Sequence, residues 1–208
     1  MCLFIESIKY KNGAFYRLDL HQMRINLVFK LYFPGFKPFQ LSKIPAFKLF
    51  KKEGIYKCRI VFDNNIKEIS ILPYERKNFE SFQLVESDID SLPYKRAERT
   101  ELNNAFQQKE NCSDIIVVKN GYLTDSSYAN IALWNGKKWV TPSNPLIFGT
   151  QRQFLITDNQ IIEGEIHLND LQKYSKIRIF NAMIEFGEIE NDISCIHQIV
   201  KRSPSNTN

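Results

Sequence analysis

The residues that could carry out chemistry stand in loops or at the ends of predicted elements. Lys95 follows Pro93-Tyr94 and offers an amine, but a lysine in such a place is most often a solvated surface group. Asp125 and Asn130 flank the stretch 126–129, and polar residues between strands usually stabilise turns. Taken singly, these residues permit nucleophilic and acid–base chemistry without indicating either.

Two further features could bind an anion. Gly149-Thr150 precedes a predicted short helix over about residues 150–157. Such a pair normally caps a helix, although the first turn also presents free N–H groups to an anion. Arg24 lies on a predicted helix whose other face is apolar, so a surface salt bridge is its simplest interpretation.

The composition excludes several classes of protein. The chain has 208 residues, of which 43% are hydrophobic and 25% charged, as in ordinary globular proteins with one large domain or two small ones. Its longest apolar runs fall far short of the roughly 20 residues that a membrane helix needs. The first residues lack the basic segment and apolar core of a signal peptide, so we expect no membrane partner and a cytoplasmic location.

The charged, cysteine and histidine residues indicate no metal site and no nucleic-acid partner. The net charge is +5, but the basic residues are spread along the chain among 23 acids, which is typical of a solvated surface. A modestly basic enzyme for anionic substrates would have the same charge. The four cysteines lack the CxxC spacing of zinc sites, and we expect them to be reduced thiols. The three histidines are far apart.

The first ninety residues indicate mostly antiparallel β-structure, because the connections are too short for crossover helices. Asn12-Gly13 suits the positive φ angles of a hairpin turn. The predicted elements are a hairpin over 4–18, a helix over 19–33 and strands over 55–62, 66–72 and 82–86. The pattern breaks over residues 87–93, so we predict an N-terminal domain over 1–90.

A C-terminal domain is predicted over residues 91–200, followed by a polar, frayed tail over 201–208. Turn residues such as Asn135-Gly136 separate its apolar segments. The predicted elements are helices over about 97–110, 150–157 and 168–173 and strands over 114–119, 129–134, 138–140 and 176–181, while residues 160–165 form a further segment without an assigned type. Residues 122–128 are predicted to form a loop.

Five short motifs follow one another along the chain. They are Phe4-Ile5-Glu6-Ser7-Ile8 with Asn12-Gly13 and His21-Gln22-Met23-Arg24-Ile25; the stretch 121–131 with Asp125 and Asn130; Trp139-Val140-Thr141-Pro142; Leu146 to Arg152; and Phe180-Asn181-Ala182-Met183. In order and spacing, over residues 3–190, they resemble the class IV aminotransferase family, the pyridoxal-phosphate enzymes of fold type IV. The resemblance implies a mixed α/β (α+β) fold of two domains, a small antiparallel-sheet N-terminal domain and a larger C-terminal one. It also implies a homodimer and a cofactor bound between the domains.

The resemblance implies a role for each candidate residue. Lys95 would hold pyridoxal phosphate covalently and carry the substrate's proton, as this chemistry requires of a lysine. Asp125 would keep the pyridine nitrogen protonated, where many members have glutamate. The remaining cofactor-binding residues would be Asn130, Gly149, Arg24 and the backbone N–H groups of Thr150 and Gln151, the last three serving the phosphate.

The resemblance leaves the reaction open between two activities on a small amino substrate. The chain begins at the F-E-x-I strand, without the family's opening strand, and is short after Gly149. Compact members are commonly lyase-like, which favours 4-amino-4-deoxychorismate lyase, a folate-biosynthesis enzyme giving 4-aminobenzoate and pyruvate. A branched-chain or D-amino acid aminotransferase is the alternative. Arg59 could bind a substrate carboxylate, although an exposed strand arginine is equally plausible.

A non-enzymatic protein is the third possibility, either a degenerate fold-type-IV chain or a basic binding module. The presence of Lys95, Asp125 and Arg24 together argues against it.

Overall fold

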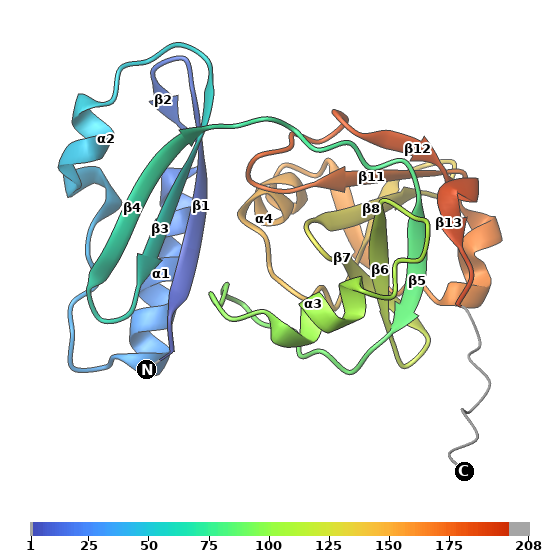
Figure 1. Ribbon diagram of the computed structural model, residues 1–208. Coiled ribbons are helices and arrows are strands. Elements are labelled where there is room, and N and C mark those ends of the chain that lie inside the picture. Colours follow the sequence, from blue (N-terminus) through green and yellow to red (C-terminus); the bar gives the residue numbers. More distant parts are fainter. Residues whose placement is uncertain (1, 200–208) are drawn as a thin grey trace.

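A computed structural model describes the protein over residues 2–199 and confirms the mixed α/β class (Figure 1). One antiparallel sheet with its helices forms the N-terminal part. Two further sheets with short helices form the C-terminal part. A long connection after residue 73 runs from the first part to the second along the top of Figure 1. The predicted tail over 201–208 lies outside the described residues.

The N-terminal sheet has four antiparallel strands in the order β2-β1-β3-β4. They are β1 (Phe4–Lys11), β2 (Ala14–Phe15), β3 (Ile55–Phe62) and β4 (Ile66–Pro73). Asn12 and Gly13 have φ angles of 46° and 95°, so the Asn-Gly turn of the first hairpin is as predicted. Its helices are α1 (Leu18–Tyr32), the 3₁₀ turn η1 (Leu41–Lys43) and α2 (Pro45–Leu49).

The two faces of this sheet have different tasks. Side chains alternate between faces along a strand, so Phe4 and Ile8 of β1 join Cys58 and Ile60 of β3 in the core under α1. The opposite face presents Ser7 and Lys57, which point toward the C-terminal part and line a pocket there. One sheet therefore supplies both a core and a wall of the candidate site.

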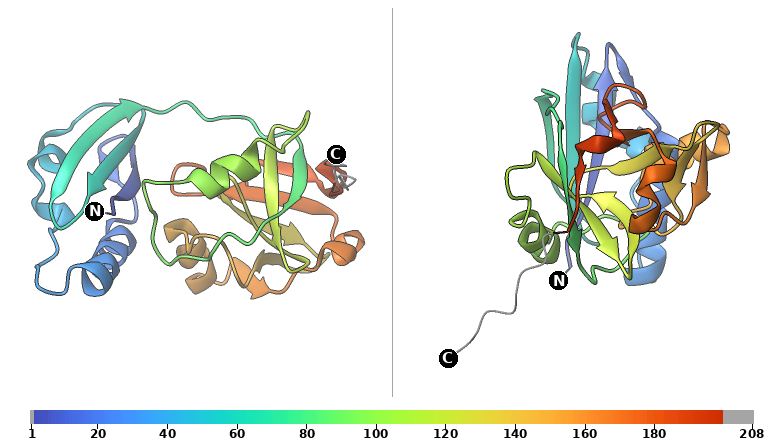
Figure 2. Two further views of the ribbon diagram at one scale, coloured as in Figure 1. Left: turned by 60° about the horizontal axis from the view of Figure 1, so that its bottom comes forward. Right: turned by 90° about the vertical axis from the view of Figure 1, so that its right-hand side faces the viewer.

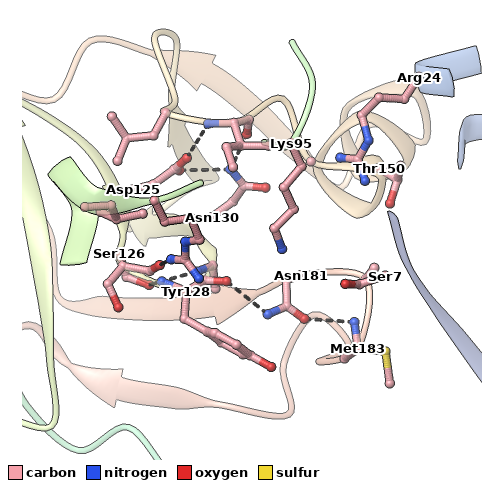
Figure 3. Close-up of a pocket in the computed structure, with 18 of the residues that line it drawn as sticks. Ser7, Arg24, Lys95, Asp125, Ser126, Tyr128, Asn130, Thr150, Asn181 and Met183 are labelled. Atoms are coloured by element: carbon pink, nitrogen blue, oxygen red, sulfur yellow. Dashed lines mark hydrogen bonds between the residues drawn. The ribbon is translucent and has the colours of Figure 1, made fainter. Parts of the chain in front are cut away.

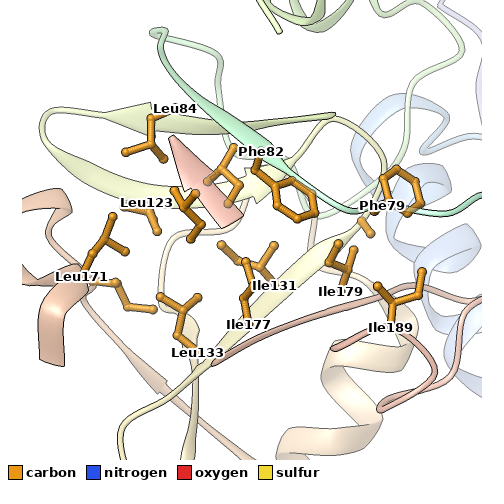
Figure 4. Close-up of a cluster of buried hydrophobic side chains, with 14 of the residues drawn as sticks. Phe79, Phe82, Leu84, Leu123, Ile131, Leu133, Leu171, Ile177, Ile179 and Ile189 are labelled. Carbon is orange, nitrogen blue, oxygen red and sulfur yellow. The ribbon is translucent and has the colours of Figure 1, made fainter. Parts of the chain in front are cut away.

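The C-terminal part is built on two sheets that pack face to face. The first has the order β13-β5-β6-β7, from β5 (Phe82–Glu86), β6 (Asp114–Lys119), β7 (Tyr122–Ser126) and β13 (Ile196–His197). The second has the order β10-β9-β8-β11-β12, from β8 (Asn130–Trp134), β9 (Trp139–Pro142), β10 (Ile161–Gly164), β11 (Lys176–Phe180) and β12 (Glu190–Asp192). Phe82, Leu84, Ile131, Ile177 and Ile179 fill the space between them (Figure 4).

Two helices cover the outer faces of these sheets. They are α3 (Thr100–Phe106) and α4 (Thr150–Thr157), and the 3₁₀ turns η2 (Leu168–Lys173) and η3 (Ile193–Cys195) complete the fold. Ile115 and Val117 of β6 pack with α3, while Ile116 and Val118 face the central core. Burial on both faces explains why this strand is a continuous apolar run rather than an alternating one.

Two assignments from the sequence are wrong. Strand β5 does not belong to the antiparallel N-terminal half, because it pairs in parallel with β6. The connection through α3 is long enough for this crossover, which the short-connection argument overlooked. Residues 122–128 are not simply a loop, since β7 occupies 122–126 and pairs antiparallel with β6. The division into domains at residue 90 stays a prediction.

The segment after β5 crosses back to the N-terminal sheet. The Lys95 carbonyl accepts the backbone N–H of Ile5 at 2.9 Å, and the N–H of Ala97 donates to the Leu3 carbonyl at 2.9 Å. Tyr94 is buried in the core under α1. The chain thus leaves the N-terminal part after β4, returns to it at residues 94–97 and crosses again to reach α3.

The state of the cysteines and the lengths of the helices complete the description. All four cysteines are free thiols. Over residues 2–199, no helix is long and apolar enough to cross a membrane.

Candidate active site

A pocket lies where the N-terminal sheet faces the C-terminal sheets, and most of the predicted site residues meet there (Figure 3). The predicted residues that line it are Arg24, Lys95, Asp125, Asn130, Gly149 and Thr150. They come from α1, the returning segment, β7, β8 and the start of α4. Arg59 and Gln151 are not among the lining residues.

Lys95 occupies the middle of the pocket (Figure 3). Because its neighbour Tyr94 is held in the N-terminal core, the extended backbone directs the Lys95 side chain the other way, into the cavity. Among residues 2–199, no acceptor lies within hydrogen-bond distance of its Nζ. Burial, helped by the positive charges of Arg24, Arg99 and Lys57, lowers the pKa of this amine to about 7. A large share of Lys95 is therefore uncharged and nucleophilic at neutral pH.

Arg24 lies at the opposite end of the pocket from Asp125 (Figure 3), and interpreting it as a surface salt bridge is wrong. Only 9% exposed, it donates from Nε and Nη2 to the two carboxylate oxygens of Glu6 at 2.7 and 2.6 Å. Burial opposes ionisation of Glu6, but the charge and hydrogen bonds of Arg24 and the hydrogen bond of His21 lower its pKa to about 2. The guanidinium is thus fixed in one orientation, with Nη1 left for a ligand.

His21 connects Glu6 to the start of α4. Its Nδ1 lies 2.6 Å from Glu6 Oε2, and its Nε2 lies 3.4 Å from Thr150 Oγ1. Since burial lowers the pKa of His21 and Glu6 is a carboxylate, the ring is neutral with its proton on Nδ1. Nε2 then accepts a hydrogen bond from the Thr150 hydroxyl. Three elements, β1, α1 and α4, are locked together at this end of the pocket.

Asp125 is the acid of the pocket, and a strand irregularity positions it. The pairs Ile116–Ser126 and Val118–Leu123 leave two β7 residues, Thr124 and Asp125, opposite one residue of β6, which is a β-bulge. Such bulges bend a strand and redirect its side chains. At 3% exposure, Asp125 is buried, and its carboxylate faces the cavity from the side opposite Arg24 (Figure 3).

The Asp125 carboxylate has two neutral donors. Oδ1 accepts from Asn130 Nδ2 at 2.9 Å, and Oδ2 accepts the backbone N–H of Ile147 at 3.0 Å. Burial raises the pKa of Asp125 to about 6 despite these bonds and the nearby charge of Arg152. A cationic donor in the pocket would relieve this shift. Asn130 also donates to the Ile147 carbonyl at 2.9 Å, so it fixes the acid relative to the loop before α4.

The start of α4 supplies backbone donors next to Arg24. Gly149 stands before the first turn, and a Cβ there would lie 2.0 Å from Asn130 Oδ1, so only glycine leaves room for that amide. Thr150 is buried and lines the pocket. Gln151 is buried behind it, and its side-chain amide makes no hydrogen bond within the described part of the chain. Only its backbone N–H remains available for the predicted role.

Lys57 and Arg99 line the pocket but were missed in the sequence interpretation, whereas Asn181 belongs to one of the five motifs. Lys57 lies in the pocket, whereas Arg59, two residues further on the same strand, does not. Side chains two residues apart on a strand lie on the same face, so Lys57 and Arg59 share one face of β3. Their positions along the strand then decide that Lys57, and not Arg59, extends into the cavity. Arg99 follows Lys95 by four residues and donates to the Ser127 carbonyl. Asn181, in the last motif, lines the pocket below Lys95 (Figure 3).

Ion pairs hold the two parts together beside the pocket. Lys9 of β1 and Arg17 both bind Glu185 of the C-terminal part, at 3.0 and 2.6 Å. Lys9 is 1% exposed, and the bonds from both cations lower the pKa of Glu185 against the effect of burial. These partly buried ion pairs and the segment over residues 94–97 therefore hold the two walls in their relative position.

Several known proteins are similar to this chain in sequence or in fold. The model of the family described as amino-transferase class IV matches residues 92–191. A Haemophilus influenzae protein named as uncharacterized is 32% identical over 180 residues, which are 86% of this chain and 96% of that protein. The crystal structure of a "putative 4-amino-4-deoxychorismate lyase" from Haemophilus somnus is 33% identical, with a TM-score of 0.81 over 88% of this chain and 97% of that one. The PLP-bound form of a "hypothetical aminotransferase" from Mycobacterium tuberculosis has the same fold at 12% identity, with a TM-score of 0.73 over 97% and 84% of the two chains.

Proposed function

Because the chain belongs to the class IV aminotransferase family, as its motifs predict, we propose that it is a pyridoxal-phosphate-dependent 4-amino-4-deoxychorismate lyase. The observation that carries this proposal is a lysine with a pKa near 7 between a buried acid and an anion-binding end. The relative from Haemophilus somnus favours the lyase over an aminotransferase, since the similarity extends over nearly its whole length.

The pocket residues fit pyridoxal phosphate in three respects. The Lys95 amine has no hydrogen-bond partner among the described residues and is available to an aldehyde. Asp125 has neutral donors only, and a protonated ring nitrogen would supply the missing positive charge. A phosphate suits the remaining donors of Arg24 and the first-turn N–H groups of α4, beside the Thr150 hydroxyl.

Each residue would then have a distinct task. When bound, pyridoxal phosphate supplies an aldehyde for the substrate amine and a ring that accepts an electron pair. Asp125 holds the proton on the ring nitrogen. Arg24 and the start of α4 hold the phosphate, so that the ring stays aligned with Lys95. Lys95 Nζ takes the proton from the amine-bearing carbon of the substrate and can return it elsewhere.

The lyase reaction needs no further reagent. Lys95 Nζ removes the proton from the amine-bearing carbon of the substrate's six-membered ring. The bond between that ring and the enolpyruvyl oxygen can then break, and the substrate ring becomes aromatic. The released enolpyruvate gains a proton on its methylene carbon and becomes pyruvate. The two products, 4-aminobenzoate and pyruvate, therefore contain all the atoms of the substrate and no others. The reaction consumes no water, oxidant or keto acid. An aminotransferase instead needs a keto acid to complete each cycle.

The test measures product per enzyme from 4-amino-4-deoxychorismate, with and without 2-oxoglutarate. We expect many turnovers of 4-aminobenzoate and pyruvate without the keto acid. Turnover only with an amino acid and a keto acid together would identify an aminotransferase. A purified protein that binds no pyridoxal phosphate, judged by its absorbance spectrum and by titration, would refute both activities.

We also propose that the protein is a cytoplasmic homodimer. Apolar side chains stand exposed on α1 and α4, among them Met23 and Leu31, at 55% and 52% exposure, and Phe154 at 42%. Several such residues suit an interface between copies of the chain. Light scattering on the fully active protein checks the mass, and an active monomer would refute the dimer.

A further inference from the structure

The pocket has more positive charge than the proposed cofactor uses. Among its described lining residues, four are basic, namely Arg24, Lys57, Lys95 and Arg99, and Asp125 is the one acid. Glu6 already neutralises Arg24, and Asp125 faces the opposite end. Lys95 is assigned to the aldehyde and to proton transfer. Lys57 and Arg99 therefore remain without an assigned partner.

Neither cation forms an ion pair within the part of the chain that the structure describes. Burial and the repulsion of Arg59, Lys77 and Arg99 lower the pKa of Lys57. Burial also lowers the pKa of Arg99, although the charge of Asp114 opposes this without an ion pair. A cation held half-buried without a counter-ion is an unfavourable arrangement that an anionic ligand would relieve.

The two cations reach the cavity from opposite walls. Lys57 extends from β3, on the face of the N-terminal sheet that also presents Ser7. Arg99 stands directly before α3, where its bond to the Ser127 carbonyl fixes the guanidinium. Both charges lower the pKa of Lys95, so both act at short range on the amine in the centre.

We infer that Lys57 and Arg99 form the carboxylate-binding subsite of the proposed substrate, which has two carboxylates, and that each cation binds one of them from its own wall. A guanidinium matches a carboxylate with two parallel hydrogen bonds, and an ammonium provides a point charge. The amine of the ligand lies at Lys95, while its carboxylates lie away from the phosphate end. This inference rests on the proposed function and names the groups that select its substrate.

The experiment measures binding without turnover. The probe is chorismate, a dicarboxylate with a hydroxyl in place of the substrate amine, titrated calorimetrically into the holoenzyme. Lys57→Met and Arg99→Gln should each weaken its binding by about 10- to 100-fold, the effect of losing one charge-assisted hydrogen bond. Binding of 4-aminobenzoate, which has one carboxylate, should weaken substantially in one of the two variants only.

Arg59→Met is the matched control, because Arg59 shares the strand and face of Lys57 but does not line the pocket. Its chorismate affinity should stay within about threefold of the unaltered protein. The affinity of all three variants for pyridoxal phosphate should also be unchanged. A parallel loss of pyridoxal phosphate affinity in Lys57→Met and Arg99→Gln would overturn the subsite, since the two cations would then serve the cofactor.

The failures of the subsite and of the lyase are distinguishable. If both variants bind chorismate as tightly as the unaltered enzyme while lyase turnover persists, the subsite is wrong and the function stands. If the enzyme performs no lyase reaction but binds 2-oxoglutarate in a manner that requires Lys57 and Arg99, the subsite stands for a different dicarboxylate and the lyase proposal falls. A holoenzyme that binds no dicarboxylate refutes the subsite.

Discussion

Two groups of charged residues meet in the same pocket and are built in opposite ways. The anchor cluster, Glu6, His21, Arg24 and Thr150, is buried, and each member contacts another at 2.6 to 3.4 Å. The cation cluster, Lys57, Lys95 and Arg99, contains no ion pair among the described residues. The first stabilises its own charges in the folded chain. The second has no counter-ion of its own, and burial lowers the pKa of all three members.

This difference suits the two clusters to different tasks: the anchor cluster to positioning a ligand, and the cation cluster to binding substrate and transferring protons. A buried ion pair that is fully hydrogen-bonded holds its groups in one geometry before any ligand arrives. An uncompensated amine instead has a pKa near the working pH, which suits proton transfer. Substitutions in the cation cluster should therefore affect chemistry and substrate binding, whereas those in the anchor cluster should affect cofactor affinity and folding together.

The largest effect is expected for Lys95→Ala. Without the amine, neither the covalent link to pyridoxal phosphate nor the proton transfer can form, so turnover should fall by about 10⁴-fold or more. Borohydride reduction followed by peptide mass spectrometry should locate the cofactor on Lys95 in the unaltered protein and nowhere in the variant. Lys137→Ala, at an exposed hairpin lysine, is the control and should keep full activity. Labelling of another lysine would contradict the assignment.

Asp125→Asn should reduce turnover by roughly 10²- to 10³-fold while cofactor still binds. The amide has nearly the same shape but carries no charge to retain the ring proton. The pyridoxal phosphate titration and the turnover assay together separate the two effects. Near-normal turnover would mean that the buried acid only organises Asn130 and the Ile147 loop. Asn130→Ala is the matched comparison, because it removes one donor to the acid and leaves its charge.

Arg24 provides a third test, and the structure changes how it must be performed. Arg24→Ala would leave the Glu6 carboxylate buried and unpaired, which destabilises a protein by about 3–5 kcal/mol. Loss of cofactor in that variant would therefore be ambiguous. The double variant Glu6→Gln with Arg24→Gln removes both charges and should recover most of the lost melting temperature. Its affinity for pyridoxal phosphate should still be roughly 30-fold weaker.

The phosphate-free ligand pyridoxal is the control for this test. It cannot use the anchor cluster, so its affinity should be the same in the unaltered protein and the double variant. Glu6→Gln alone should lower the affinity for pyridoxal phosphate by about tenfold, because we expect Glu6 to act on the phosphate only by orienting Arg24. If the affinities for pyridoxal and for pyridoxal phosphate fall equally in all variants, the anchor cluster stabilises the fold and does not bind the phosphate.

The sequence predicted the elements of the fold better than their pairing. Helix α1 and strands β1, β3 and β6 have nearly the predicted bounds, because periodicity and turn residues are local signals. The parallel pairing of β5 with β6 is a long-range contact that a short-connection argument could not give. Strand β7 was missed because Leu123 to Ser126 alternates poorly, and its bulge is what places Asp125.

The site shows the same limit. Lys95, Asp125 and Arg24, which line the pocket, were selected through motif order, which reflects one family's chemistry rather than local spacing. Glu6 was quoted within a motif but received no role, since its partners on α1 and α4 lie far away in sequence. The sequence interpretation selected Arg59, whereas Lys57 lines the pocket. The alternation along a strand identifies the face on which a side chain lies, but not whether that side chain extends into the pocket.

The smallest effect concerns the free energy of unfolding of the cofactor-free protein, which Lys95 should lower. Its pKa is about 7 in the folded protein and 10.5 when unperturbed, so folding disfavours the charged amine. Below pH 7 both states carry the charge and the full destabilisation applies. Between pH 7 and about 10.5 the folded state releases its proton first, and the destabilisation fades.

Lys95→Met should accordingly melt a few degrees higher than the unaltered protein at pH 6, with the difference vanishing near pH 10. Differential scanning calorimetry on cofactor-free protein measures this, with Lys137→Met as an exposed control that should show no pH-dependent difference. Saturating pyridoxal phosphate should reverse the order, because only the unaltered protein gains the energy of covalent binding. If Lys95→Met instead melts lower at every pH, Lys95 stabilises the folded chain through a partner, and the distinction between the two clusters fails.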